Sequence, residues 1–188
     1  MARRFFAFAV GILTVLGHAV ADAQTSSLGD GEVYMQINLW AENGRPIPTT
    51  NYHKGERIPI GSKVKILASN ASQITFSYNG QTLILQKLKH TLVGMDTVKS
   101  RTFGTTDPLA SKAFSELPEA QQNAVKTGQV IAGMPKAAVL MAYGYPPEHK
   151  TPSTGSDLWL YWLDKFRTQS VMFVNDSASV LTGFAETL

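Results

Sequence analysis

Cysteine is absent from all 188 residues of the sequence. This absence excludes disulfide bonds, thiolate zinc sites and thiol nucleophiles. It also excludes a lipid attached to an N-terminal cysteine after export. A chain without these supports must be stabilised by core burial, and this length suffices, because a chain of about 150 residues buries roughly 70% of its unfolded surface.

A strong charge of either sign is also lacking. The chain has 17 basic and 14 acidic residues, a net charge of +3. Its densest basic stretch, Lys87, Lys89 and His90, has no aromatic platform beside it and matches no nucleic-acid motif. We therefore expect no nucleic acid among the partners.

The first 23 residues have the three parts of a secretory signal peptide. Arg3 and Arg4 precede an apolar run over residues 5–20, which ends at a small-residue cleavage site, Ala-Asp-Ala. Because glycines interrupt the run and no basic stop-transfer flank follows, we expect cleavage after residue 23 and no stable membrane insertion. An uncleaved N-terminal anchor is the alternative. Export without a lipid anchor predicts a periplasmic protein.

The first half of the mature chain has the pattern of β-strands. Residues 32–40 alternate apolar and polar side chains, and residues 63–68, 73–78 and 81–88 predict three further strands. Asn-Gly at positions 79 and 80 predicts a tight hairpin between the last two. Glycines and prolines in residues 41–57 predict a long loop.

The pattern becomes helical near residues 105–108. Asp107 can cap a first helix over residues 109–117, and Pro108 suits its first turn. Two more helices are predicted over residues 117–126 and 135–143. The chain then returns to strands, predicted by three runs with a turn at Asn-Asp between the last two: residues 158–163, 170–175 and 179–184.

Three short motifs in the second half carry a family resemblance. They are Gly-Met-Pro-Lys at residues 133–136, Gly-Tyr-Pro-Pro at 144–147 and Trp-Leu-Tyr-Trp at 159–162. Over residues 122–184 the chain resembles the SmpA/OmlA family, the small outer-membrane lipoprotein module of the β-barrel assembly machinery. The resemblance implies two helices packed on a three-stranded antiparallel sheet. It also implies an envelope protein that binds other macromolecules.

The first half resembles a bacterial SH3-like small barrel through the turn and strand of residues 58–66, with a β-sandwich or a stack of hairpins as the alternatives. We therefore predict an α+β protein with a β-rich domain over residues 24–105 and a helix-helix-three-stranded-sheet module over residues 106–188. Family members carry an N-terminal lipidated cysteine, which this chain lacks, and the minimal member has no strand-rich segment before the module. The resemblance therefore transfers no functional residue.

The loop over residues 43–57 is the first candidate binding segment. Its prolines exclude a regular element, and loops of this length are often functional. The types of residue that it gathers are those that make good contacts with a partner. The candidates are Arg45, Asn51, Tyr52, His53 and Arg57. A plain solvated connection is the alternative.

A second candidate segment covers residues 145–157 and contains His149 among several prolines. Proline rigidity and closure of the fold explain this segment nearly as well. The aromatic residues of 159–173 could form a sugar or peptide platform, but core packing explains them better, because alternate strand residues must cover the helices.

No catalytic signature is found. The mature histidines, His53, His90 and His149, lack the spacing of metal ligands and are expected to be exposed to solvent. No nucleophile elbow, phosphate loop or dinucleotide fingerprint is present. We therefore expect no enzyme, no cofactor and no metal.

The sequence predicts an exported protein that binds envelope proteins, with outer-membrane assembly components among the candidate partners. A cell-wall or glycan-binding protein is one alternative. A periplasmic hydrolase without a recognisable motif is the other. The oligomeric state does not follow from the sequence.

Overall fold

The computed structural model describes residues 31–185, with side chains described as far as residue 179. The predicted signal peptide, residues 1–23, lies outside the described residues. Within the described part of the chain, no helix combines the length and the apolar character that crossing a membrane requires.

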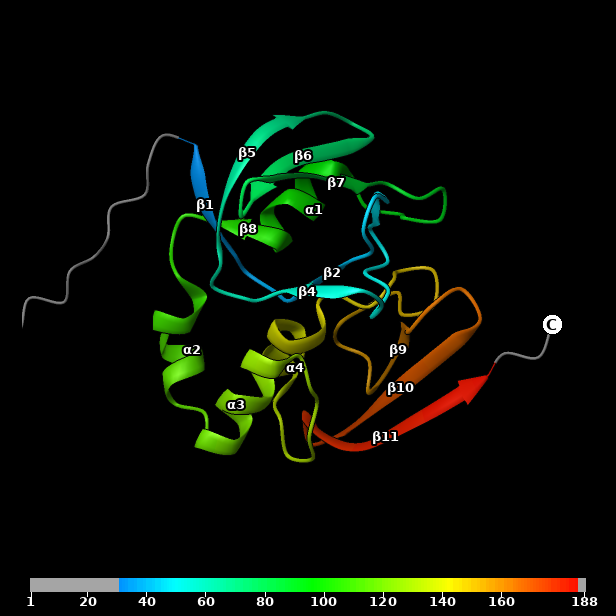
Figure 1. The fold of residues 1–188 in the computed structure, drawn as a ribbon. Helices are drawn as coiled ribbons and strands as arrows, with labels where there is room; N and C mark the ends of the chain where they lie inside the picture. The colour runs from blue at the N-terminus through cyan, green and yellow to red at the C-terminus, as the bar shows by residue number, and fades with distance from the viewer. Residues whose placement is uncertain (1–30, 186–188) are drawn as a thin grey trace, which may run out of the picture.

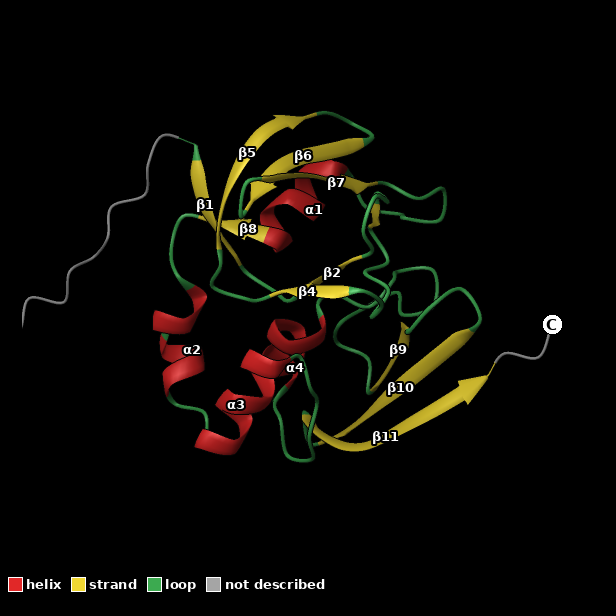
Figure 2. Cartoon of the chain, in the orientation of Figure 1, coloured by secondary structure: helices red, strands yellow, loops and turns green. Residues whose placement is uncertain are grey.

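The first half forms a six-stranded sheet that curls into a half-barrel around one helix, α1 (Met95–Thr102) (Figures 1 and 2). All neighbours in this sheet are antiparallel except the first pair, which is parallel. In spatial order its strands are β3 (Ile47–Pro48), β7 (Gln81–Gln86), β6 (Gln73–Tyr78), β5 (Lys63–Ser69), β1 (Glu32–Met35) and β8 (Phe103–Gly104). The three strands predicted over residues 63–88 are therefore confirmed.

The hairpin between β6 and β7 turns at the predicted Asn-Gly pair. Asn79 and Gly80 have φ values of 49° and 77°, the left-handed conformation that a two-residue hairpin of this hand requires. The register Tyr78↔Gln81 closes the turn directly. The local sequence is therefore sufficient to predict this turn.

The single strand predicted over residues 32–40 is wrong. The chain leaves the half-barrel after Met35, and a separate strand, β2 (Leu39–Ala41), pairs with β4 (Glu56–Ile58) in a two-stranded sheet. Three consecutive residues, 37, 38 and 39, are all buried. A strand with a period of two cannot bury three neighbours on one face, so the backbone bends here.

Helix α1 was not predicted, whereas the later helices were. A 3-10 turn, η1 (Pro108–Ala110), is capped by the Asp107 carboxylate as expected and leads into the short α2 (Lys112–Ser115). The predicted second and third helices appear as α3 (Glu119–Thr127) and α4 (Lys136–Tyr143). Gly128 ends α3 in the left-handed conformation, with φ 68°.

The last part of the chain forms a three-stranded antiparallel sheet in the order β11, β10, β9. Trp159, Tyr161 and Phe173 point from one face toward α3 and α4 and are buried, which agrees with core packing. Asn175 and Asp176, with φ 51° and 59°, form the predicted turn. The strands are β9 (Leu158–Trp162), β10 (Arg167–Val174) and β11 (Ser177–Ala185).

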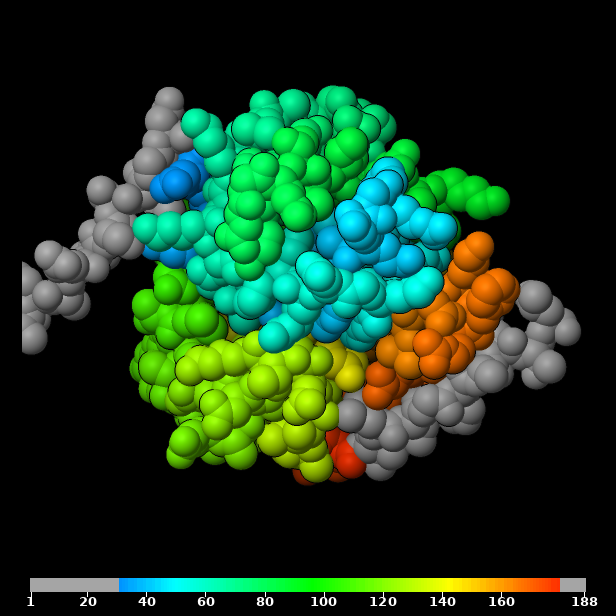
Figure 3. Space-filling view, in the orientation of Figure 1, coloured from blue at the N-terminus to red at the C-terminus, as the bar shows by residue number. Residues whose placement is uncertain are grey.

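The molecule is thus a mixed α+β protein whose two halves each have a hydrophobic core. Figure 3 shows the halves packed directly against each other. The fully buried Asn38 joins them, because its Nδ2 donates to the carbonyls of Val125 at 2.8 Å and Ala142 at 3.0 Å. Its Oδ1 accepts from the amide of Ile60 at 3.0 Å. Asn38 therefore contributes a fully hydrogen-bonded polar contact to the junction between the halves.

Candidate functional site

Two residues of the first candidate loop are turned toward the junction between the halves. Asn51 is buried, and its Nδ2 donates to the carbonyls of Asn38 at 3.0 Å and Tyr143 at 3.1 Å. Arg57 donates to the carbonyl of Lys126 and to Oδ1 of Asn38. Both side chains therefore join the first half to the ends of α3 and α4.

His53 lies in an aromatic cage at the same junction. Its ring centroid is 4.1 Å from that of Trp40 and 4.4 Å from that of Tyr143. Burial lowers the pKa of His53 to about 4, and the hydrogen bond between its Nε2 and the carbonyl of Tyr143 offsets only part of this effect. The ring is therefore neutral at pH 7, and the prediction of a solvent-exposed histidine is wrong at this position.

Arg45 and Tyr52 lie instead at the surface of the same loop. Together with Lys54 they line a cleft of about 280 Å³, whose opposite wall includes Asp164 and Lys165 in the turn between β9 and β10. Glu42 neutralises part of the basic charge, because its carboxylate is 3.2 Å from Lys54 and 3.9 Å from Arg45. Arg45 is exposed and Tyr52 is half-buried, so both side chains can contact a partner that enters this cleft.

His149, the candidate in the second loop, is packed between rings. Its centroid is 4.4 Å from His90 and 6.4 Å from Trp162. His90 follows β7 in the first half, so the pair is another contact between the halves. Among residues 31–185, no group of three or more His, Cys, Asp or Glu side chains is arranged to hold a metal ion.

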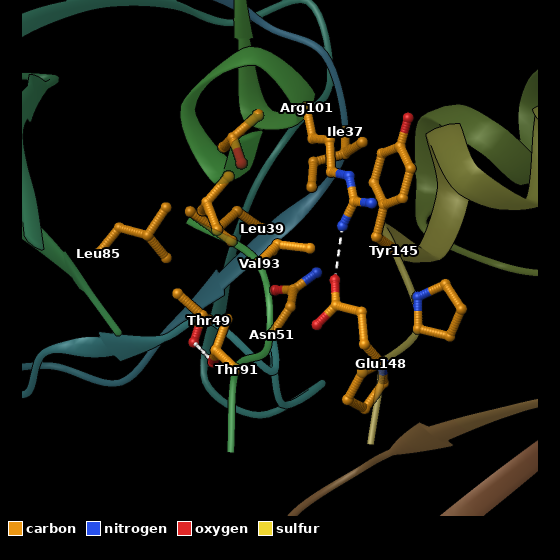
Figure 4. Close-up of a pocket in the computed structure, with 14 residues that line it drawn as sticks. Ile37, Leu39, Thr49, Asn51, Leu85, Thr91, Val93, Arg101, Tyr145 and Glu148 are labelled. Atoms are coloured by element: carbon orange, nitrogen blue, oxygen red, sulfur yellow. Dashed lines mark hydrogen bonds and ion pairs between the residues drawn. The ribbon is translucent and has the colours of Figure 1, made fainter. Parts of the chain in front are cut away.

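The second loop also forms a cleft with α1. Arg101 Nη1 lies 2.6 Å from Glu148 Oε1, and the guanidinium carbon is 4.3 Å from the ring centroid of Tyr145 (Figure 4). The side chains of Arg101 and Glu148 are only 26% and 17% exposed. This half-buried ion pair is less screened by water and salt than a surface pair would be.

The ion pair separates two hollows. The inner cavity, of about 40 Å³, lies between the half-barrel and residues 145–148. The outer hollow, of about 210 Å³, is formed by the same Arg101, Tyr145 and Glu148 together with hydroxyl and proline side chains of residues 151–154. The inner cavity is lined on its apolar side by Ile37, Leu39, Leu85, Val93 and Val98.

The outer face of the three-stranded sheet is the second accessible surface of note. Leu158, Met172 and Val174 point away from the helices and are 53%, 48% and 55% exposed. Leu158 is directly opposite Met172 in the register, and Val174 is the next residue of β10 on that face. These three form a contiguous aliphatic patch.

Comparison with protein-family models, with curated proteins and with solved structures gives no match. The SmpA/OmlA and SH3-like resemblances therefore stay predictions.

The sequence reasoning missed Arg101 as a site residue because it missed α1. The signal was present: Met95, Val98 and Thr102 follow helical spacing and are the buried residues of this helix. Its partner Glu148 is 47 residues away in the chain, and no local pattern reveals such a pairing.

Proposed function

We propose that this chain is an exported, non-enzymatic binding protein of the bacterial cell envelope that acts through contacts with other proteins. The aliphatic patch of Leu158, Met172 and Val174 carries the proposal. Six large hydrophobic side chains are exposed among residues 31–179, and three of them lie side by side here. Contiguous apolar patches of this kind are typical of surfaces that bind a partner.

The partner is a folded envelope protein that presents an aliphatic surface, because apolar groups that meet across an interface are removed from water together. The resemblance of residues 122–184 to the SmpA/OmlA family, whose members bind other envelope macromolecules, supports such a role.

Capture by the purified protein from an envelope extract tests this proposal. We expect Met172→Lys to abolish retention of partners, because it places a charge within the apolar contact. Leu92→Lys is the matched control, because Leu92 is 69% exposed and lies on the first half, away from the patch. If the two variants have equal thermal stability and retain equal amounts of partner protein, the sheet face is not the docking surface.

A further inference from the structure

We propose that the cleft at Arg101 is a binding site for a small aliphatic amino-acid residue with a free α-carboxylate. The site is separate from the aliphatic patch of the sheet. Three of its features define the ligand: a cation with unused donors, an anion with an unused acceptor, and a small apolar cavity behind them.

Arg101 provides the recognition of the carboxylate. Its guanidinium has five N–H donors in a planar fork, and Nη1 contacts Glu148. The guanidinium carbon also lies over the ring of Tyr145, and among the side chains of residues 31–179 no acceptor other than Glu148 receives a hydrogen bond from this group. Two N–H groups on one edge of the fork can donate parallel hydrogen bonds to a ligand carboxylate.

Glu148 selects for a donor on the same ligand. Oε1 receives the bond from Arg101, whereas Oε2 has no hydrogen-bond donor among the described residues. A carboxylate arriving alone would meet a like charge within a half-buried cleft, which is unfavourable. An ammonium or amide N–H on the adjacent carbon would donate to Oε2 and remove this cost. The pair therefore favours an α-amino acid over a simple carboxylic acid.

The inner cavity limits the size of the side chain. A cavity of about 150 Å³ holds benzene, which is about 25 Å³ for each carbon, so 40 Å³ admits one or two carbon atoms. The methyl group of alanine fits, whereas the side chain of phenylalanine does not. The outer hollow of 210 Å³ lies on the opposite side of the ion pair and leaves room for a preceding residue. The ligand can therefore be a free amino acid or the C-terminal residue of a peptide.

Titration calorimetry of the full chain tests the inference with matched probes. Alanine is compared with propanoate, which lacks the amine, and with ethylamine, which lacks the carboxylate. We expect alanine to bind at least about tenfold more tightly than either, since a hydrogen bond to a charged group contributes about 1.5–3 kcal/mol. Phenylalanine should not bind. Glycyl-alanine distinguishes the two sources of the ligand: tighter binding than alanine indicates a peptide end, and weaker binding indicates a free amino acid.

Two variants test the residues. Arg101→Lys keeps the charge and loses the planar fork, and should weaken alanine binding about 10- to 100-fold. Arg167→Lys is the control, because Arg167 is 63% exposed and forms its ion pair with Asp164 elsewhere. Glu148→Gln gives an independent measurement should Arg101→Lys fail to fold, and it should reduce the ratio of the affinities for alanine and propanoate. No binding at millimolar alanine, or equal binding by Arg101→Lys and the wild type, would overturn the inference.

Discussion

Replacing Asn38 by alanine should destabilise the protein more than any other single exchange at the junction. The amide contacts three carbonyls and two donors from both halves of the molecule: Val125, Met141, Ala142, Ile60 and Arg57. Each buried hydrogen bond contributes about 1 kcal/mol net, and each buried polar group left without a partner costs about 1–3 kcal/mol. We expect a loss of about 3–5 kcal/mol, a large share of the roughly 5–15 kcal/mol that stabilises a typical domain.

Urea unfolding followed by circular dichroism measures this loss, and calorimetry should show a fall in Tm of about 10 °C, at roughly 2–4 °C per kcal/mol for a chain of this size. Asn70→Ala is the matched control. Asn70 also uses its side-chain oxygen in three hydrogen bonds, to Ser72 and Gln73, but it is exposed to solvent. Water replaces those bonds, so a loss below about 1 kcal/mol is expected. Equal losses in the two variants would refute a special role for Asn38.

Three other predictions concern the junction and the second core. Because the pKa of His53 is about 4 in the fold and about 6.5 in the unfolded chain, the unfolded chain binds this proton first. The contribution of the neutral His53 ring to the free energy of unfolding is therefore fully present above pH 6.5. This contribution falls by at most roughly 3 kcal/mol as the pH drops toward 4. Urea midpoints at pH 7 and 4.5 should differ more for wild type than for His53→Gln, and an identical pH dependence would contradict a neutral buried ring. Gly128→Ala should lower the free energy of unfolding more than Gly44→Ala in the same assay. Both glycines have φ near 70°, but an added methyl group at Gly128 meets two side chains at 3.0 Å, whereas an added methyl group at Gly44 meets open space. Equal losses would mean that only the backbone strain of about 1–2 kcal/mol matters at both positions. Trp159→Ala, at a fully buried position, should cost about 3–5 kcal/mol in thermal unfolding, whereas Phe166→Ala, at a position 57% exposed, should leave Tm nearly unchanged. A larger fall in Tm for Phe166→Ala than for Trp159→Ala would favour an aromatic platform over core packing.

The elements that the sequence predicts correctly are those fixed by local chemistry. The Asn-Gly and Asn-Asp turns adopt the left-handed conformation that these residues tolerate, whatever surrounds them. Helix α4 is bounded by Pro135 and Gly144, whose effects also act within a few residues. Such signals can be read without knowing the tertiary structure.

The elements that it misses are fixed by distant partners. After the bend at Met35, the side chain of Asn38 donates to carbonyls at the ends of α3 and α4, which lie far along the chain. His53 was expected to be exposed because a polar loop surrounds it in the sequence, but its ring neighbours include Tyr143 and Tyr161. The Arg101–Glu148 cleft was likewise not predicted, because its two charged residues are 47 residues apart in the sequence. In the structure Arg45 and Tyr52 line a surface cleft. That they bind a partner stays a prediction.

The position of Asn38 also sets the order in which parts of the protein can form. Its amide meets Val125 and Ala142, which follow it by 87 and 104 residues. The half-barrel buries its core with residues of the first half alone, but these acceptors for Asn38 come from the second half. Contacts over such separations form late and slow the folding of a chain. We therefore expect the core of the half-barrel to form before the junction, with the amide of Asn38 still hydrated until the second half has folded.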